Sequence, residues 1–230
     1  MQMELTLINK KQETLSTVSF FFKSSSPIFW TPGQFLILTL DHKNPDVRGK
    51  MRFFTISSAP FENHIAITTK IDDNASSSFK KALSQLKLGD KIQAKGPDGN
   101  FILEDVFAEY VFIAGGIGIA AFRPIILDLA NDKSPIKITL LYANKDDDIL
   151  FKNELEEIAK SNPNFKINYF INPNQISEDS IKKLVPDLKK PLYYISGPNN
   201  MVENLFTMLK NLGIEEKKIK LDYFHGYKTI

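Results

Sequence analysis

The chain has 230 residues, of which 43% are hydrophobic and 24% are charged, and its formal net charge is +2. This composition is ordinary for a packed protein of one or two domains and excludes a disordered or repetitive chain. The near-neutral charge argues against nucleic acid as a required partner. The absence of cysteine excludes disulfides, thiolate metal sites and cysteine-bound iron–sulfur clusters.

Neither a signal segment nor a membrane span is expected from this sequence. Residues 1–12 lack the basic region and apolar run of a secretory signal. The longest apolar stretch, residues 110–122, is too short to cross a bilayer and is interrupted by glycines. We therefore expect a cytoplasmic protein, either a monomer or a weak oligomer.

The first hundred residues predict short strands separated by turns, which is typical of a barrel or sandwich. The strands are expected at residues 4–9, 17–23, 34–40, 51–57, 64–70 and 91–95. One helix interrupts them, because Phe79, Leu83 and Leu86 fall on one face. Ser78 is its expected N-cap and Gly89 its expected end.

From about residue 106 the sequence alternates buried strands with helices, which predicts a parallel sheet. The strands are expected at residues 111–114, 136–142, 166–171, 192–196 and 219–224, and the helices at 120–129, 148–160, 180–185 and 201–212. The sequence therefore predicts a β domain over residues 1–105 and an α/β domain over residues 106–230.

Two glycine-bearing turns each join a strand of the α/β domain to a helix. They are Gly115-Gly116-Ile117-Gly118 and Ser196-Gly197-Pro198-Asn199-Asn200-Met201. Such turns let the backbone approach a ligand, and the helix N-terminus that follows favours an anion such as a pyrophosphate. Two of them in one parallel sheet can flank a crevice at its carboxyl edge. A turn that only permits tight packing explains the first of them equally well.

Two motifs of the β domain also suit a phosphate-bearing ligand. In Arg52-Phe53-Phe54-Thr55, strand alternation places Arg52 and Phe54 on one face, where a guanidinium and a ring suit a ligand with a phosphate and a flat ring system. Ser76-Ser77-Ser78 precedes the predicted helix and offers hydroxyls to a phosphate. An arginine at the edge of the core and plain N-capping are the alternatives.

Taken in order, these motifs resemble the ferredoxin–NADP⁺ reductase family, and the resemblance covers nearly the whole chain. The Arg52–Thr55 run resembles its Arg-x-Tyr-Ser/Thr flavin motif, and the turns at residues 114–119 and 196–202 resemble its Ala-Gly-Gly-x-Gly-Ile and Cys-Gly-Pro-Pro-x-Met-Val motifs. The family's Gly-Pro-x-Gly-x-Phe motif is similar to residues 96–101, and its next nucleotide-binding strand and helix are similar to residues 140–155. Its Glu-x-Phe-x-Gly-Tyr ending is similar to residues 222–227.

The resemblance implies an N-terminal antiparallel Greek-key β-barrel that binds FAD, followed by a Rossmann-like parallel sheet flanked by helices that binds NADH or NADPH. Arg52 would contact the FAD pyrophosphate, Phe54 would stack on the isoalloxazine, and Thr55 would bond near the flavin N5. Phe224 would lie near the other flavin face, and Ser196 near the transferred hydride. The other cofactor-binding residues would be Phe53, Thr69, Lys70, Ser76, Ser77, Ser78, Gly115, Gly116, Ile117, Gly118, Asn144, Lys145, Gly197, Pro198, Asn199 and Met201.

Three positions depart from the family pattern. Phe54 stands where the family has tyrosine, so a hydroxyl contact is lost while stacking remains. Ser196 replaces the cysteine beside the transferring hydride, and slower transfer is one expected consequence. Ala120-Ala121 replaces the common Thr-Pro.

The implied function is an FAD-dependent NAD(P)H oxidoreductase that passes electrons to a separate protein, such as a ferredoxin, an oxygenase component or a haem protein. A reductase of free flavin, ferric chelates or quinones, and a non-catalytic nucleotide-binding subunit, are the alternatives. Asp146 beside Lys145 favours NADH over NADPH. No metal site is expected, because His42, His64 and His225 lack ligand spacing and Asp146-Asp147-Asp148 suits a turn before a helix.

Overall fold

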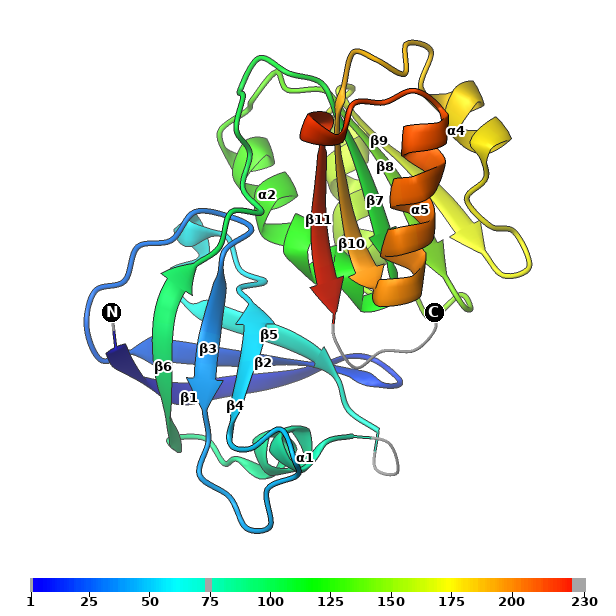
Figure 1. Ribbon diagram of the computed structural model, residues 1–230. Helices are drawn as coiled ribbons and strands as arrows, with labels where there is room; N and C mark the ends of the chain where they lie inside the picture. Colours follow the sequence, from blue (N-terminus) through cyan, green and yellow to red (C-terminus); the bar gives the residue numbers. More distant parts are fainter. Residues whose placement is uncertain (1, 73–75, 225–230) are drawn as a thin grey trace. The chain divides into compact units, whose positions relative to one another are not determined.

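The computed structural model describes residues 2–72 and 76–224, apart from the side chain of Phe224. Its contacts divide the chain into two compact units, Met1–Ile102 and Leu103–Ile230, coloured blue to green and green to red in Figure 1. The sequence placed this boundary between residues 105 and 106. Each unit has its own sheet and core, so each is described by itself.

The described part of the first unit forms a six-stranded sheet in the order β4-β3-β6-β1-β2-β5, with every pairing antiparallel. Its strands are β1 (Gln2–Thr14), β2 (Thr17–Ser24), β3 (Phe35–Thr39), β4 (Met51–Thr55), β5 (Ile65–Lys70) and β6 (Lys91–Asp98). The edge strands meet where the chain leaves β4, because Ser57 N donates to Ala66 O of β5 at 2.8 Å. The expected antiparallel β domain is confirmed, and its sheet curls into a half-barrel (Figure 1).

The core of this unit lies on the concave side of the sheet. Alternate residues of β1, Met3, Leu5 and Leu7, are buried, as period-two alternation requires. Helix α1 (Ser78–Gln85) closes the core with Phe79 and Leu83, both fully buried.

Two details of α1 correct the sequence prediction. The N-cap is Ser77, whose hydroxyl accepts from Lys80 N at 3.3 Å, rather than Ser78. The helix ends at Gln85, before Gly89, because the backbone at Leu86 turns to an extended ψ of 143°.

The described part of the second unit forms a five-stranded, wholly parallel sheet in the order β11-β10-β7-β8-β9. The strands are β7 (Tyr110–Gly115), β8 (Ile138–Asn144), β9 (Phe165–Ile171), β10 (Leu192–Pro198) and β11 (Ile219–Phe224). This arrangement confirms the Rossmann-like sheet. The chain order reverses beside β7, since β8 and β9 continue on one side of it and β10 and β11 on the other.

Helices cover both faces of this sheet (Figure 1). They are α2 (Ile119–Asn131), α3 (Lys152–Ser161), α4 (Glu178–Leu184) and α5 (Asn199–Asn211). Phe122 of α2 stacks on Phe112 of β7 at 4.6 Å, whereas Val202 of α5 packs with Val111 and Ile113 on the opposite face. Strand β7 is buried along its whole length because both faces are covered.

Helix α3 begins later than the sequence predicted, at Lys152 rather than residue 148. Asp148 N donates to the Asp146 carboxylate at 3.1 Å, which forms a turn, and Phe151 has a left-handed φ of 60° that interrupts the helical backbone. Across the described residues, no helix is long and apolar enough to cross a membrane.

Candidate functional site

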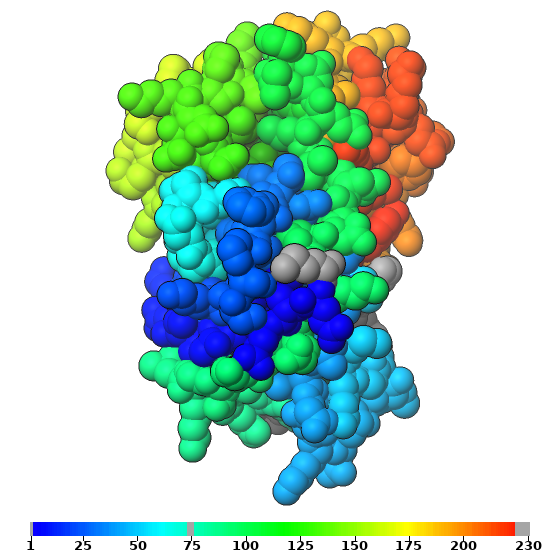
Figure 2. Space-filling view, turned by 90° about the vertical axis from the view of Figure 1, so that its left-hand side faces the viewer, coloured from blue at the N-terminus to red at the C-terminus, as the bar shows by residue number. Residues whose placement is uncertain are grey.

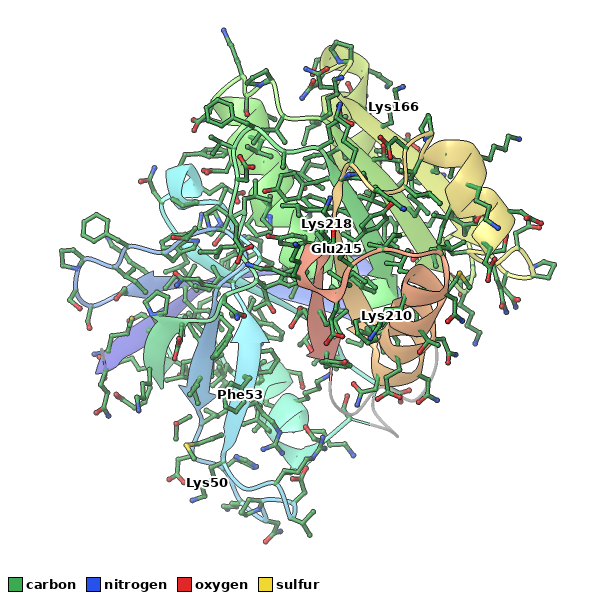
Figure 3. All side chains as sticks on the ribbon, turned by 45° about the horizontal axis from the view of Figure 1, so that its top comes forward. Lys50, Phe53, Lys166, Lys210, Glu215 and Lys218 are labelled. Atoms are coloured by element: carbon green, nitrogen blue, oxygen red, sulfur yellow. The ribbon has the colours of Figure 1, made fainter. Side chains whose placement is uncertain are left out.

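The Arg52–Thr55 run forms edge strand β4 and presents two of its side chains to α1. The Arg52 guanidinium lies 5.5 Å from the ring centroid of Phe79, and the Phe54 ring lies 5.7 Å from the same ring. Strand alternation explains this shared face. Phe53, labelled in Figure 3, points to the opposite face of β4 and is 68% exposed. Its ring centroid lies 5.4 Å from that of Phe35.

The Arg52 side chain is only 13% exposed and is held by the loop before its own strand. Its Nη1 donates to three carbonyl oxygens, those of Arg48, Gly49 and Met51, at 2.6–2.9 Å. Its Nη2 donates to Asp46 Oδ1 at 2.8 Å. The buried Nε has no hydrogen-bond partner among the described residues. The arginine therefore retains one donor that an anionic ligand can satisfy.

Each of the three serines at the N-terminal end of α1 has an intramolecular bond. Ser76 Oγ accepts from Asp72 N at 2.7 Å, and Ser77 Oγ caps the helix. Ser78 Oγ accepts from Asp46 N at 2.8 Å and lies 3.0 Å from His42 Nε2. Leu40 O can only accept, so His42 Nδ1 donates to it at 2.9 Å.

The Asp46 carboxylate lies between Arg52 and the N-terminus of α1. Its Oδ2 accepts from Ser78 N at 3.2 Å, and its Oδ1 accepts from Arg48 N at 2.9 Å as well as from Arg52. Desolvation favours the neutral carboxyl, but the Arg48 amide and the charges of Arg52 and Arg48 outweigh it and lower the pKa of Asp46 to about 2. Sequence analysis missed this residue.

The remaining expected flavin contacts lie on β4 and β5. Thr55 ends β4, is half-buried and pairs with Phe35 of β3. Thr69 is 2% exposed within β5, while Lys70 ends that strand half-buried and its carbonyl accepts from Lys80 Nζ at 3.2 Å. The structure thus brings Arg52, Phe54 and the serines together around α1.

In the second unit, the two glycine-bearing turns lie side by side at the carboxyl ends of β7 and β10. Ser196 pairs with Ala114, so Gly197 stands beside Gly115. A Cβ on Gly118 would fall 2.1 Å from Ser196 O, and one on Gly197 would fall 3.3 Å from Gly115 Cα. The sequence-based expectation that the turns share one edge is confirmed, and backbone contacts backbone there.

This edge is the point at which the order of the strands reverses. Open α/β sheets bind ligands in the crevice outside the carboxyl ends of the strands at such a point. Among the described residues, neither α2, with Gly118 at its N-cap, nor α5, with Pro198 there, has a side-chain capping bond. The N-terminal ends of both helices thus lie at this edge, which is the end of a helix that favours an anion such as a phosphate.

Tyr142 of β8 contacts the Gly115–Gly118 turn through its hydroxyl. Its hydroxyl lies 3.2 Å from both Gly116 O and Leu150 O, and the ring is fully buried. Burial raises the pKa of this phenol well above its usual value, so Tyr142 is a neutral donor. Sequence analysis quoted this residue within a motif but gave it no role.

The Ser196 side chain is fully buried, and its hydroxyl donates to Asp222 Oδ2 at 3.0 Å. The register of the parallel strands explains the contact, because Ser196 of β10 pairs directly with Asp222 of β11. A buried hydroxyl beside a carboxylate is thereby fixed in one rotamer at the glycine-rich edge. The side chain of Phe224 and residue His225 lie outside the described residues.

The other expected nucleotide contacts follow the same edge. Asn144 is buried at the end of β8, and Lys145 and Asp146 after it are exposed. Asn199 and Met201 open α5, and Met201 Sδ would lie 3.3 Å from a Cβ on Gly197. Among residues 2–72 and 76–224, no group of three acidic or histidine side chains is placed to hold a metal ion.

These features fit the cofactors that the resemblance implies. In the first unit, Arg52 Nε is an unsatisfied buried donor beside a half-buried aromatic ring. In the second, two turns that a Cβ would block bring the N-terminal ends of α2 and α5 to one edge. An anionic ligand with flat rings suits the first, and a dinucleotide phosphate suits the second.

Comparisons with known proteins match both units. Residues 4–102 match the family model described as an oxidoreductase FAD-binding domain, and residues 112–205 match that of an oxidoreductase NAD-binding domain. The chain is 29% identical over 201 residues to a component of the Na(+)-translocating NADH-quinone reductase of Klebsiella pneumoniae, covering 76% of this chain and 49% of that protein. The chain therefore spans about half the length of this curated relative.

Solved structures share the fold. The flavohem-like FAD/NAD-binding domain of nitric oxide dioxygenase from Vibrio cholerae matches with a TM-score of 0.83 and 19% identity, covering 96% of this chain and 98% of that one. Ferredoxin-NADP+ reductase from Plasmodium falciparum matches with a TM-score of 0.81 and 20% identity, covering 97% and 96%. With both domain models in tandem, the chain is an FAD- and NAD-binding oxidoreductase, and it shares the fold of ferredoxin-NADP+ reductase.

Proposed function

We propose that this chain is an NAD(P)H-dependent flavoprotein reductase that passes electrons to an acceptor outside the chain. The observation that carries the proposal is the pair of glycine turns in backbone contact where the strand order reverses, at Gly118 and Ser196. Such an edge suits a dinucleotide, and the family match places an FAD-binding domain before it.

In the first unit, we propose that Arg52 and the N-terminus of α1 hold the FAD pyrophosphate. Arg52 Nε supplies a charged donor, and Phe54 offers a ring face on the same side of β4. Thr55, Thr69 and Lys70 line the rest of the flavin. When bound, FAD supplies the step from a two-electron donor to one-electron or two-electron acceptors.

In the second unit, the residues of the switch-point edge hold the nicotinamide nucleotide. The N-terminal ends of α2 and α5 attract its phosphates, and the buried Ser196 hydroxyl, bonded to Asp222, gives this edge a fixed polar group. The residues orient the ring rather than move protons, so positioning is their main contribution to rate. Asp146, exposed after β8, favours NADH through the ribose hydroxyl.

The relatives indicate more than one class of acceptor. The Klebsiella pneumoniae protein carries a quinone reductase name, and a further relative, 24% identical over 238 residues, is flavohemoprotein A of Dictyostelium discoideum. We propose a redox protein as the acceptor, with small molecules such as quinones as the second candidate. The cysteine-free sequence fits a reducing compartment such as the cytoplasm.

Steady-state oxidation of NADH by the FAD-loaded full chain tests this proposal. We expect slow oxidation without an added acceptor and fast oxidation with one, and a lower kcat/KM for NADPH than for NADH. Arg52→Ala should lose FAD, whereas Arg48→Ala, whose guanidinium is half-exposed beside Asp46, should retain it. Equal FAD retention by both variants would contradict the Arg52 assignment, and no NADH oxidation with any acceptor would contradict the function.

A further inference from the structure

The loop between β3 and β4, residues 41–50, places a carboxylate on the donors proposed for the FAD pyrophosphate. Asp46 accepts from Arg52 Nη2 at 2.8 Å, from Ser78 N at the start of α1 at 3.2 Å and from Arg48 N at 2.9 Å. A cationic guanidinium, a helix N-terminal amide and a loop amide are the kinds of donor that bind phosphate. Asp46 thus makes the contacts of a bound anion.

We propose that Asp46 is an internal anion that competes with FAD for Arg52 and the N-terminus of α1, so that FAD binds fully only after Asp46 leaves them. This competition rests on the flavin site proposed above, and it would regulate how much FAD that site binds. It is confined to contacts within the first unit.

Asp46 occupies two of the donors that a pyrophosphate would use. Arg52 Nη1 is already shared among three carbonyl oxygens, so Nη2 and Nε are left for a ligand, and Asp46 bonds to Nη2. The first amide of α1 also bonds to Asp46. Because Asp46 is ionised at neutral pH, a phosphate brought to the same donors would meet a like charge at short range.

The loop that carries Asp46 is attached to the domain by this carboxylate, by the bonds from Arg52 Nη1 to the Arg48 and Gly49 carbonyl oxygens, by His42 beside Ser78 and by backbone bonds. At its base Leu40 N donates to Lys50 O at 3.0 Å, and near its tip Asp46 N donates to Ser78 Oγ at 2.8 Å. Val47 beside Asp46 is fully exposed, and the loop projects at the bottom of Figure 1 and reaches the surface in Figure 2. An outward movement of the loop tip would therefore uncover little of the core.

Asp41 provides a matched control in the same loop. Its carboxylate is 90% exposed and pairs with Lys50, which is labelled in Figure 3, and neither of these two side chains bonds to Arg52 or to α1. Asp41→Asn removes the same charge from the loop as Asp46→Asn while the donors of the site stay unchanged. A general effect of loop charge on an anionic ligand would appear in both variants.

Equilibrium binding of FAD and of ADP to the FAD-free full chain tests the competition. ADP carries the pyrophosphate without the flavin. We expect Asp46→Asn to bind both ligands about tenfold more tightly than the wild type, as the loss of one charged competitor predicts, and Asp41→Asn to bind them like the wild type. Asp46→Ser, which also removes the charge, should reproduce the gain and guards against an effect particular to asparagine.

Unchanged or weaker binding by both Asp46 variants, with wild-type FAD binding intact, would overturn the competition and would make Asp46 a residue that orients Arg52. An equal gain in Asp41→Asn would also overturn it. Failure of the wild type and all variants to bind FAD is a different result, since it overturns the flavin site itself.

Discussion

The hydroxyl of Ser196 is buried at the end of β10 and donates to Asp222 on β11 at 3.0 Å. Ser196→Ala removes this bond, and we expect the free energy of unfolding to fall by about 1–3 kcal/mol, the cost of a buried bond to a charged group. Denaturant unfolding measures it. Ser161→Ala, at an exposed hydroxyl of α3, is the control and should change little.

The same substitution should also slow reduction of the flavin by NADH about tenfold while the Kd of NADH changes little, because small errors in position cost rate steeply. Rapid mixing under anaerobic conditions separates the two quantities. A reduction rate equal to that of the wild type would show that Ser196 has no part in hydride transfer and that its bond to Asp222 is only structural.

Gly118 has no room for a side chain, because a Cβ would lie 2.1 Å from the Ser196 carbonyl oxygen, which cannot move without moving β10. Gly118→Ala should cost about 2–3 kcal/mol of unfolding free energy, as overpacking against backbone does, and should weaken nucleotide binding. Gly89→Ala, with no atom within 4 Å of its Cβ and a φ of +91°, should cost only the backbone penalty of about 1 kcal/mol. Equal costs would contradict the close approach.

Individual residues were predictable where a local motif specified them and not where distant segments met. The glycines of both turns could be named from the sequence because each follows a buried strand directly. The partners of Ser78 could not be named from the sequence. Asp46 and His42 lie 32 and 36 positions away, and only the path of the folded loop brings them to Ser78. The Ser196–Asp222 bond likewise depends on the strand register.

At the scale of elements, loop 41–50 and α1 are joined by a carboxylate whose pKa is lowered to about 2. Between about pH 2 and pH 4, the Asp46 carboxylate is protonated in the unfolded chain but still ionised in the folded chain. The stabilisation from the ionised Asp46 is therefore present above about pH 4 and is lost as the pH falls towards 2. We expect the unfolding free energy of Asp46→Asn to fall less steeply than that of the wild type below pH 4. If the unfolding free energies of the two proteins fell in parallel with pH, the hydrogen bonds and charges around Asp46 would not lower its pKa in the folded state.

Helices α2 and α3 are joined by a two-bond ion pair in which Arg123 Nε and Nη2 donate to the Glu154 carboxylate, both at 2.7 Å. Arg123 is 12% exposed and its guanidinium also lies 5.0 Å from the Phe151 ring centroid. Glu154→Gln should lower the unfolding free energy by about 1–2 kcal/mol. Glu157→Gln, at an exposed pair on the same helix, should change it by no more than about 0.5 kcal/mol.

Most elements were predictable because their periodicity is strong, and the exceptions have local causes. β1 runs to Thr14, well beyond the predicted residue 9, because a register shift after Leu7 breaks the alternation that marks a strand. The α3 start was placed too early because its charged turn resembles a helix N-terminus. The edge contact between Ser57 and β5 arises from the curl of the sheet, which no local pattern encodes.

For the whole molecule, the order of the two units carries the functional argument. An FAD-binding domain over residues 4–102 precedes an NAD-binding domain over residues 112–205, and the chain covers only about half of its quinone reductase relative. The two domains contain the features needed to bind the cofactors, and under the proposed function a redox protein or a small molecule outside the chain accepts the electrons.

Anaerobic addition of NADH to the FAD-loaded chain tests this account most directly. The visible absorbance of the bound flavin should bleach with one equivalent of NADH and return when an acceptor is added. A protein that stays colourless after incubation with FAD, or whose bound flavin neither NADH nor NADPH bleaches, would contradict the account.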